Sequence, residues 1–385
     1  MKILFISLGC DKNLADSETM LGLLASRGYQ IVDTEEDADV IIVNTCCFIH
    51  DAMEESIETI LQMAEYKKSG SLKALIVTGC MAERYREEIT KEIPEVDAVL
   101  GTASYGHILD AVDGALAGQS YLKMEPLDTL PLVNTHRMVT TGGHYAYLKI
   151  AEGCDKHCTY CIIPKLRGNF RSVPMEHLLR EAKQLADDGV KEIILVAQET
   201  TLYGKDFYGE KKLPELLRRL CKISGIRWIR ILYCYPEEIT EELIQTIKEE
   251  PKICHYLDLP IQHASDDVLK RMGRRTSKEE LIHIISRIRE EIPDITLRTT
   301  LITGFPGESK EQHEELMDFV DEMAFDRLGV FTYSAEDGTP AAQMPDQVEE
   351  SVKDARRAEL MELQQEIAFD QAEQMIGREV LVMIE

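Results

Sequence analysis

Three short apolar runs near the start of the chain each end in a cysteine. They read ILFISLGC to Cys10, VIIVNTC to Cys46 and LIVTGC to Cys80. Short runs rich in Ile and Val, separated by amphipathic helical segments, are typical of buried parallel strands. We expect these strands at Lys2–Leu8, Val40–Asn44 and Leu75–Thr78. Because parallel strands of an open, doubly wound α/β sheet end along one edge, the three cysteines should converge there as a metal site.

Other residues near that edge have simpler explanations. Taken singly, each of the three cysteines could be a core thiol. Cys47 follows Cys46 directly, so we expect it to point elsewhere. Asn13 and Asn44 either orient the site or cap turns. A helix from Asp16 to Arg27, ended by Gly28, is expected between the first two strands.

The second part of the chain repeats strand–helix units after a predicted linker near residues 118–144. Six strands fall short of the eight in a closed (β/α) barrel, so we expect an open, partial (β/α)6 barrel. A long charged helix should follow over 345–377, and then a strand from Arg378 to Ile384 that has no partner. The expected strands of the barrel are Tyr145–Ala151, Glu192–Ala197, Arg227–Tyr233, Tyr256–Pro260, Ile295–Thr303 and Arg327–Tyr333.

A second cysteine group lies directly after the first of these strands, in EGCDKHCTYC. Cys154, Cys158 and Cys161 can hold three irons of a 4Fe–4S cluster and leave the fourth iron open. The alternative is a zinc knuckle with His157 as its fourth ligand, but His157 adjoins Cys158, which makes joint ligation awkward. Three further cysteines stand singly in apolar stretches and are expected to be buried thiols: Cys221, Cys234 and Cys254.

The composition indicates a soluble globular chain of two or three domains. It has 385 residues, 44% of them hydrophobic and 29% charged, and a net charge of −26. Without a signal-peptide layout at its start or an apolar run of about 20 residues, we expect a cytoplasmic protein. The net charge of residues 146–334 is only −5. Their basic side chains either lie on a solvated surface or form a site for an anionic cofactor or substrate. These side chains are Lys165, Arg167, Arg171, Arg271, Arg274 and Arg275.

The cysteine spacing, its position after a strand and the aromatic Tyr160 resemble the radical S-adenosylmethionine (SAM) superfamily. The resemblance implies that SAM binds the open iron and is cleaved to a 5′-deoxyadenosyl radical. Tyr160 would flank the adenine, Glu199 would receive the SAM ammonium, and Gly304 would let the backbone approach SAM closely. Plainer alternatives are a packing aromatic, a charge at a helix N-terminus and a strand-to-helix turn.

Two three-cysteine groups on two such lobes resemble the radical SAM methylthiotransferase family. The motifs that carry this resemblance are SLGCDKNLADSE, NTCCFI, TGC, EGCDKHCTYCIIPKLRG and TGFPGES. Membership implies a flavodoxin-like N-terminal lobe, a radical SAM barrel and two 4Fe–4S clusters, the second of which presents sulfur. It implies domains at 1–130 and 140–375, with 376–385 as the start of a truncated C-terminal TRAM β-domain.

The segment SLGCDKNLADSE resembles the RimO branch, which modifies the β-carbon of an aspartate in ribosomal small-subunit protein twelve. The tRNA-modifying MiaB branch usually has a GCQMN-like segment there. An acidic surface also suits a basic protein better than tRNA. The resemblance further implies an electron donor of flavodoxin or ferredoxin type and no membrane partner. A MiaB-type tRNA enzyme and a non-catalytic iron–sulfur or zinc protein remain the alternatives.

Overall fold

The computed structural model describes residues 1–70, 72–130, 132 and 135–384, which form two compact units. Unit 1 comprises Met1–Gly143, Tyr147–Asp155 and Ile162–Glu181. Unit 2 comprises His144–Ala146, Lys156–Cys161 and Ala182–Glu385. Within the second cysteine motif, Cys154 therefore belongs to unit 1, whereas Cys158 and Cys161 belong to unit 2.

The sheet of unit 1 has six parallel strands in the order β2-β1-β3-β4-β5-β6. The first five follow the 2-1-3-4-5 order of flavodoxin-like folds, which confirms the doubly wound expectation. The strand order reverses beside β1, so β1 and β3 flank the switch point where such sheets bind ligands. The strands are β1 (Lys2–Ser7), β2 (Gln30–Val32), β3 (Val40–Thr45), β4 (Ala74–Gly79), β5 (Ala98–Leu100) and β6 (Tyr121–Lys123).

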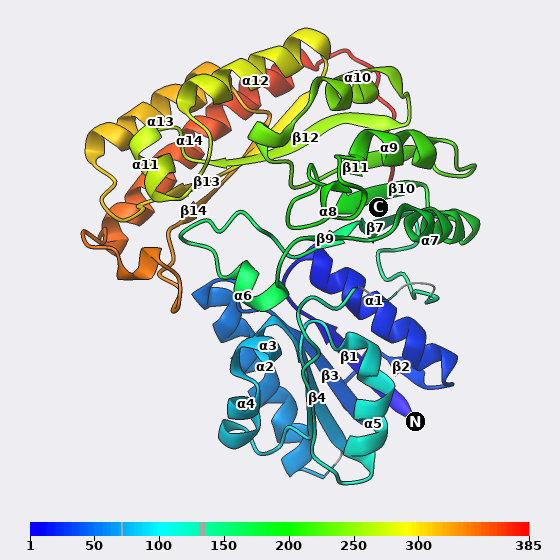
Figure 1. The fold of residues 1–385 in the computed structure, drawn as a ribbon. Coiled ribbons are helices and arrows are strands. Elements are labelled where there is room, and N and C mark those ends of the chain that lie inside the picture. The colour runs from blue at the N-terminus through cyan, green and yellow to red at the C-terminus, as the bar shows by residue number, and fades with distance from the viewer. Residues whose placement is uncertain (71, 131, 133–134, 385) are drawn as a thin grey trace. The chain divides into compact units, whose positions relative to one another are not determined.

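Helices lie on both faces of this sheet (Figure 1), and an apolar core is buried on each face. Ile41 and Val43 of β3 face the core that includes α2, whereas Val40 and Ile42 face the core with α1 and α5. Burial on both faces explains why the strands are apolar throughout rather than alternating. The helices of this unit are α1 (Asp11–Ser26), α2 (His50–Lys68), α3 (Cys80–Tyr85), α4 (Glu87–Glu92), α5 (Ile108–Leu116) and α6 (Ile163–Arg167).

Two expectations for unit 1 differ from the structure. Helix α1 begins at Asp11 rather than Asp16, because Cys10 takes the extended N-cap conformation. Strand β6 lies inside the predicted linker and pairs with β5 at the edge of the sheet. Its three residues are too few to give a periodic signal. The expected linker therefore contains a strand of the first sheet.

The second sheet has six strands in the order β14-β13-β12-β11-β10-β7. Strands β14 and β7 stand at opposite ends of this order, so the sheet does not close into a ring, as expected for a partial barrel. A separate antiparallel pair joins β8 (Ala151–Glu152) to β9 (Arg171–Ser172) within unit 1. The sheet is built from β7 (Tyr145–Lys149), β10 (Glu192–Val196), β11 (Trp228–Ile231), β12 (Ile253–Gln262), β13 (Thr296–Thr303) and β14 (Arg327–Thr332).

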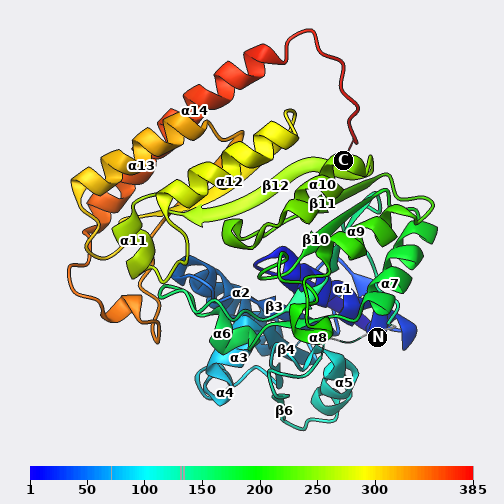
Figure 2. The ribbon, with the colours of Figure 1, turned by 45° about the horizontal axis from the view of Figure 1, so that its top comes forward.

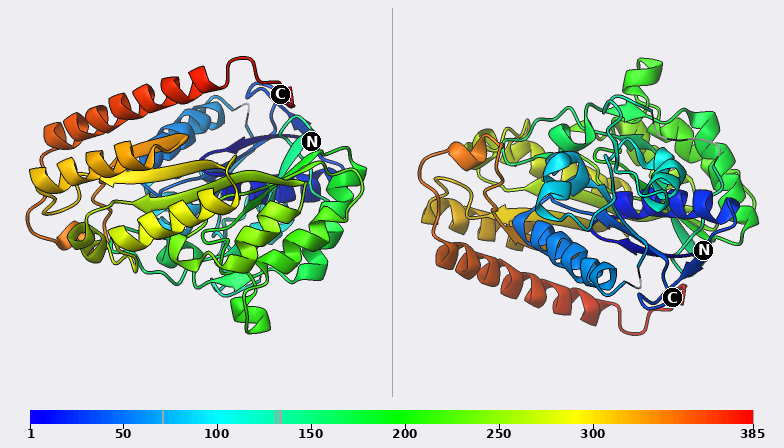
Figure 3. Two further views of the ribbon diagram at one scale, coloured as in Figure 1. Left: turned by 90° about the horizontal axis from the view of Figure 1, so that it is seen from above. Right: turned by 90° about the horizontal axis from the view of Figure 1, so that it is seen from below.

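Helices follow the strands of unit 2 and lie along its sheet (Figure 2). Ser309 begins α13 with a capping box to Gln312, which fixes the end of the TGFPGE loop. Helix α14 lies alongside α13 and β14, as the views in Figure 3 also show. The helices are α7 (Met175–Asp187, shared by the two units), α8 (Lys205–Tyr208), α9 (Leu213–Cys221), α10 (Glu241–Glu249), α11 (Asp266–Arg271), α12 (Lys278–Glu291), α13 (Lys310–Met323) and α14 (Glu350–Gln374).

The expected strand from Arg378 to Ile384 is wrong for the structure described. Residues 378–384 form neither strand nor helix, and Leu381 and Ile384 are largely exposed. A strand needs a neighbour to accept its backbone hydrogen bonds, and this segment pairs with no described strand. Among the described residues, moreover, no helix combines the length and apolar character that crossing a membrane requires.

Candidate metal and cofactor sites

The first three cysteines all lie at carboxyl ends of neighbouring strands in unit 1. Cys10 is the N-cap of α1 after β1, Cys46 directly follows β3, and Cys80 opens α3 after β4. Since β1, β3 and β4 are adjacent and parallel, these ends share one edge of the sheet. The strand pattern thus placed the three residues correctly on one edge, with Cys10 and Cys80 at the N-terminal ends of α1 and α3.

Two asparagine side chains fasten this edge. Asn13 is fully buried and donates from Nδ2 to the carbonyls of Leu8 (3.1 Å) and Thr45 (2.9 Å). Asn44 donates to the carbonyl of Asn13 (3.0 Å) and to the hydroxyl of Ser17 (2.8 Å). Together they join β1, β3 and α1, so they orient the backbone from which the cysteines project.

The thiols at this edge influence one another electrostatically. Burial raises the pKa of Cys80 to about 12, with smaller contributions from Cys10 and Cys46, while the charge of Arg167 opposes the rise. Burial and the neighbouring Cys10 also raise the pKa of Cys46. Deprotonation of three neighbouring thiols in a largely buried site is unfavourable unless a metal or another cation compensates the negative charge.

The chemistry of these side chains suits an iron–sulfur group. Cysteine thiolates are the ligands of 4Fe–4S clusters, whereas a structural zinc site needs a fourth nitrogen or sulfur ligand. Gly9 has a φ of +86°, and a Cβ there would lie 3.0 Å from the Cys46 sulfur, so the backbone passes close to this thiol. The residues therefore fit a multi-iron group held by three thiolates.

Cys47 lies among apolar side chains instead. It is fully buried in the core that contains Ile60 and Met63, and burial raises its pKa to about 12. It thus occupies the place expected of an inert thiol, next to the triad in sequence but packed into the α2 side of the sheet.

The loop of the second cysteine motif is tied down within each unit. In unit 1, the amide of Cys154 donates to the carbonyl of Gly168 at 3.1 Å. In unit 2, the amide of Cys161 donates to the carbonyl of Cys158 at 3.0 Å, which closes a turn, and Thr159 is bonded to the backbone that follows α11. His157 is exposed, with a left-handed φ of 52°. None of the three cysteines is in a disulfide, so each can serve as a ligand.

Glu199 follows β10 and is the most unusual carboxylate of unit 2. It is 1% exposed; its Oε1 accepts from the amide of Thr201 at 3.0 Å, while Oε2 is buried without a hydrogen-bond partner. Lys156 approaches Oε2 only to 3.8 Å and bonds Glu238 at 2.6 Å. Burial raises the pKa of Glu199 to about 7. A buried, unsatisfied carboxylate of this kind is suited to receive a cationic ligand group.

Replacing Glu199 by glutamine should stabilise the ligand-free chain in a pH-dependent way. The folded-state pKa of Glu199 is raised from 4.5 to about 7. Between these two pH values the carboxyl ionises in the unfolded chain but stays protonated in the folded chain, so the stability of the fold falls as the pH rises. We expect Glu199→Gln to gain about 3 kcal/mol above pH 7 and almost nothing near pH 4.5. Thermal unfolding at pH 4.5 and pH 8 measures this, and an equal shift at both values would contradict it.

Arg274 is a buried cation with spare donors in the same unit. Its Nη2 donates to the carbonyl of Pro260 at 3.1 Å and its guanidinium lies 4.3 Å from the ring centre of Tyr235. Its Nε and Nη1 are buried without hydrogen-bond partners among the described residues. Burial works to lower the pKa of Arg274, but the charges of Tyr160, Tyr235 and Cys158 outweigh it and raise that pKa. Unpartnered guanidinium donors fit an anionic ligand group such as a carboxylate.

Tyr160 contacts Phe305, the residue that follows Gly304 in the chain. The Tyr160 ring meets Phe305 edge-on at 6.5 Å between centroids, and burial beside Cys158 holds the Tyr160 pKa well above its ordinary value. Gly304 has a φ of +71°, and a Cβ there would lie 2.3 Å from Cγ of Lys353 on α14. The close packing of α14 thus explains this glycine without any ligand.

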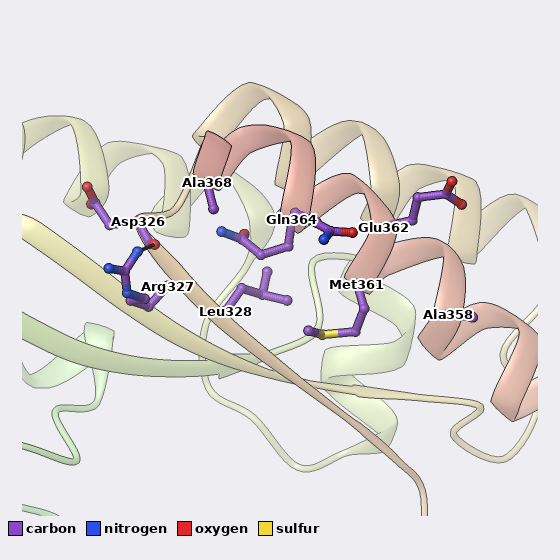
Figure 4. A pocket seen from close by; sticks show the side chains of 9 residues that line it. Asp326, Arg327, Leu328, Ala358, Met361, Glu362, Gln364 and Ala368 are labelled. Carbon is purple, nitrogen blue, oxygen red and sulfur yellow. Dashed lines mark hydrogen bonds between the residues drawn. The ribbon is translucent and has the colours of Figure 1, made fainter. Parts of the chain in front are cut away.

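A hollow of about 620 Å³ lies elsewhere in unit 2, between β14 and α14 (Figure 4). Leu328, Met361 and Gln364 are among its lining residues. None of the cysteines, nor Tyr160, Glu199 or Gly304, lines it. Its surroundings offer none of the chemistry described above, so we assign it no part in the site.

Comparison with known proteins identifies the family. Residues 2–101 match "Uncharacterized protein family UPF0004" and residues 148–320 match the radical SAM superfamily. A protein of Lachnoclostridium phytofermentans named ribosomal protein uS12 methylthiotransferase RimO is 66% identical over all 385 residues and is itself covered to 88%. The chain belongs to the RimO family. A RimO protein of Clostridioides difficile is 51% identical over the whole chain, with 87% of that protein covered.

As a RimO-family member, the chain is a radical SAM transferase whose cofactors are SAM and two 4Fe–4S clusters. Solved structures agree in fold. TsrM of Kitasatospora setae gives a TM-score of 0.62 at 12% identity and covers 88% of this chain and 76% of its own. OxsB gives 0.59 at 14% identity and covers 94% and 56%. At these identities the likeness concerns the fold alone.

The sequence did not single out three buried charged residues that lie near the cysteines and Glu199. Lys156 lies inside the cysteine motif, yet nothing in its spacing shows that it would meet Glu238. Arg167 and Arg274 were expected only as members of a basic group. No signal in the sequence distinguishes these two buried arginines from Lys165 and Arg275 of the same group, which are exposed.

Proposed function

We propose that the chain attaches a methylthio group to the β-carbon of an aspartate in ribosomal small-subunit protein uS12. The observation that carries the proposal is the pair of three-cysteine groups in a chain that is 66% identical to a protein named for this activity. When bound, the clusters and SAM supply the radical, the sulfur and the methyl group. The chain supplies the ligands, the orientation and a site that excludes water.

The residues divide into two sites. Cys154, Cys158 and Cys161 are the ligands of the cluster that binds SAM. The ligands of the sulfur-presenting cluster are Cys10, Cys46 and Cys80. The first assignment is supported by the motif spacing, and the second by three free thiols on one edge of the sheet. Each set leaves one iron without a protein ligand, which is the position that a substrate group needs.

Three side chains and one glycine of unit 2 contribute to the SAM site. Glu199 receives its ammonium, because the buried Oε2 lacks a partner. Arg274 receives its carboxylate through the unpartnered Nε and Nη1. Tyr160 lies beside the adenine, and Gly304 follows β13 on the loop that completes the adenine site. We further propose a cytoplasmic setting with an electron donor of flavodoxin or ferredoxin type.

Replacing Arg274 by methionine should weaken SAM binding. Loss of a charge-assisted hydrogen bond costs about 1.5–3 kcal/mol, so we expect the dissociation constant to rise about 10- to 150-fold. Calorimetry on the anaerobically reconstituted chain measures it. Arg275→Met is the matched control, because Arg275 is the exposed neighbour. Equal affinities for the two variants would contradict the role of Arg274.

The test of the proposed function uses the reconstituted full chain with SAM, reductant and either purified uS12 or tRNA. We expect uS12 to gain the mass of a methylthio group less one hydrogen, on the peptide that contains its target aspartate. A uS12 variant with that aspartate replaced by alanine is the control. Modification of tRNA alone, or turnover of SAM with no product on uS12, would overturn the proposal.

A further inference from the structure

A buried arginine lies next to the first cysteine site and belongs to the same unit. Arg167, the last residue of α6, is 2% exposed. Its Nη1 donates to Asp16 on α1 at 2.9 Å and to Glu152 on β8 at 3.1 Å. Its Nη2 donates to the side-chain oxygen of Asn13. All four side chains are nearly or fully buried, so these contacts are shielded from water.

A second cation completes this group. Nζ of Lys149 donates to the other oxygen of Asp16 and to Glu152 at 2.7 Å, and it is also buried. The group thus consists of two cations and two carboxylates with no net charge. Such a network is expensive to desolvate and is strongly destabilised when a single member is removed. A buried network this costly to desolvate calls for a role besides packing.

Arg167 is also connected to a cysteine of the first site through Asn13. The Asn13 oxygen that accepts from Arg167 lies 3.9 Å from the Cys80 sulfur, so both residues converge on one amide. Arg167 is thus a buried cation in the hydrogen-bond network that reaches Cys80 through Asn13.

We propose that Arg167 is a positioning residue of the first cysteine site. It holds Asn13 against Cys80 and places a fixed positive charge beside a cluster bound by the triad. Positive charge at low dielectric favours the more negative, reduced form of such a cluster, so it raises the reduction potential. The proposal rests on the assignment of Cys10, Cys46 and Cys80 as cluster ligands.

The same ion-pair network also contacts the strand that leads into the second cysteine motif. Glu152, which binds both cations, is separated from Cys154 by Gly153 alone, and a Cβ on Gly153 would lie 2.1 Å from the carbonyl oxygen of Asn169. Arg171, from the same strand pair, donates to the carbonyl of Arg167 at 2.8 Å. The network therefore fixes, within unit 1, the short strand that leads into Cys154 as well as the edge that carries Cys80.

The test is a redox titration followed by electron paramagnetic resonance. The parent is the full chain with Cys154, Cys158 and Cys161 replaced by alanine, so that only the first site holds iron. Arg167→Met combined with Glu152→Gln removes one charge of each sign and keeps the buried group neutral. The matched control is Arg137→Met with Glu18→Gln, because Arg137 is likewise buried against a carboxylate of α1 at 3.2 Å.

We expect the Arg167 pair to load iron and to need a potential about 59 mV lower, a tenfold change in the one-electron equilibrium constant. The control pair should match the parent. Arg167→Lys, the variant least prone to misfold, keeps the charge and should shift the equilibrium less than threefold. An unchanged potential in the Arg167 pair, an equal shift in the control, or a tenfold shift in Arg167→Lys would overturn the proposal. A parent that binds no iron would instead overturn the metal assignment itself, and the proposal with it.

Discussion

Replacing Cys154, Cys158 and Cys161 together by alanine should abolish reductive cleavage of SAM by the reconstituted chain. We assign these three thiolates as the protein ligands of the cluster that binds SAM, because their spacing within one motif suits a 4Fe–4S cluster. Formation of 5′-deoxyadenosine, measured by chromatography under reducing conditions, should fall to the level of a protein-free control. Methylthio product on uS12 should disappear with it.

The control for this experiment is Cys221→Ala. Cys221 is a buried thiol at the end of α9, and burial raises its pKa to about 12, as expected of an inert residue. This variant should cleave SAM at the parent rate. If the triple variant still released 5′-deoxyadenosine, the assignment of the motif would be wrong.

Replacing Cys10, Cys46 and Cys80 by alanine should separate the two activities. SAM cleavage should persist, because its cluster ligands lie in the other motif. The methylthio product on uS12 should be lost, because no site remains to present sulfur. Mass spectrometry of uS12 alongside 5′-deoxyadenosine analysis gives both readings from one reaction.

Cys47→Ala is the control here, since Cys47 adjoins Cys46 in sequence but packs into the apolar core. It should retain both activities, with only the modest loss of stability expected for a small cavity. Loss of the methylthio product in the Cys47 variant would mean that the triad has been assigned to the wrong cysteines. If the triple variant still formed the product, these three cysteines could not hold a cluster that methylthio transfer requires.

The convergence of Cys10, Cys46 and Cys80 could be predicted because it depends on topology rather than on detailed packing. Parallel strands end on one edge whatever their side chains, and a cysteine directly after each strand must lie there. Six strands in the second sheet were equally predictable from their apolar runs. The family resemblance gave the assignment of two clusters, which strand periodicity alone does not contain.

The charged groups around these sites could not be predicted in the same way. Asp16 and Lys149 meet across 133 positions of sequence, and Arg167 reaches Asn13 across 154. No local pattern encodes such pairs, because they depend on how β8 and α6 return to α1. At Gly304 the sequence suggested more than the structure requires. Its motif suggested close approach to a ligand, whereas the structure shows that a Cβ at this position would clash with Lys353.

The most direct test of the account is the iron content of three reconstituted proteins: the full chain, the Cys10/Cys46/Cys80 triple-alanine variant and the Cys154/Cys158/Cys161 triple-alanine variant. Iron and sulfide analysis with Mössbauer spectroscopy should give about eight irons per chain for the first protein and about four for each variant, because each motif holds its own 4Fe–4S cluster. Zinc in place of iron, or the loss of all iron from either variant, would contradict two independent cluster sites.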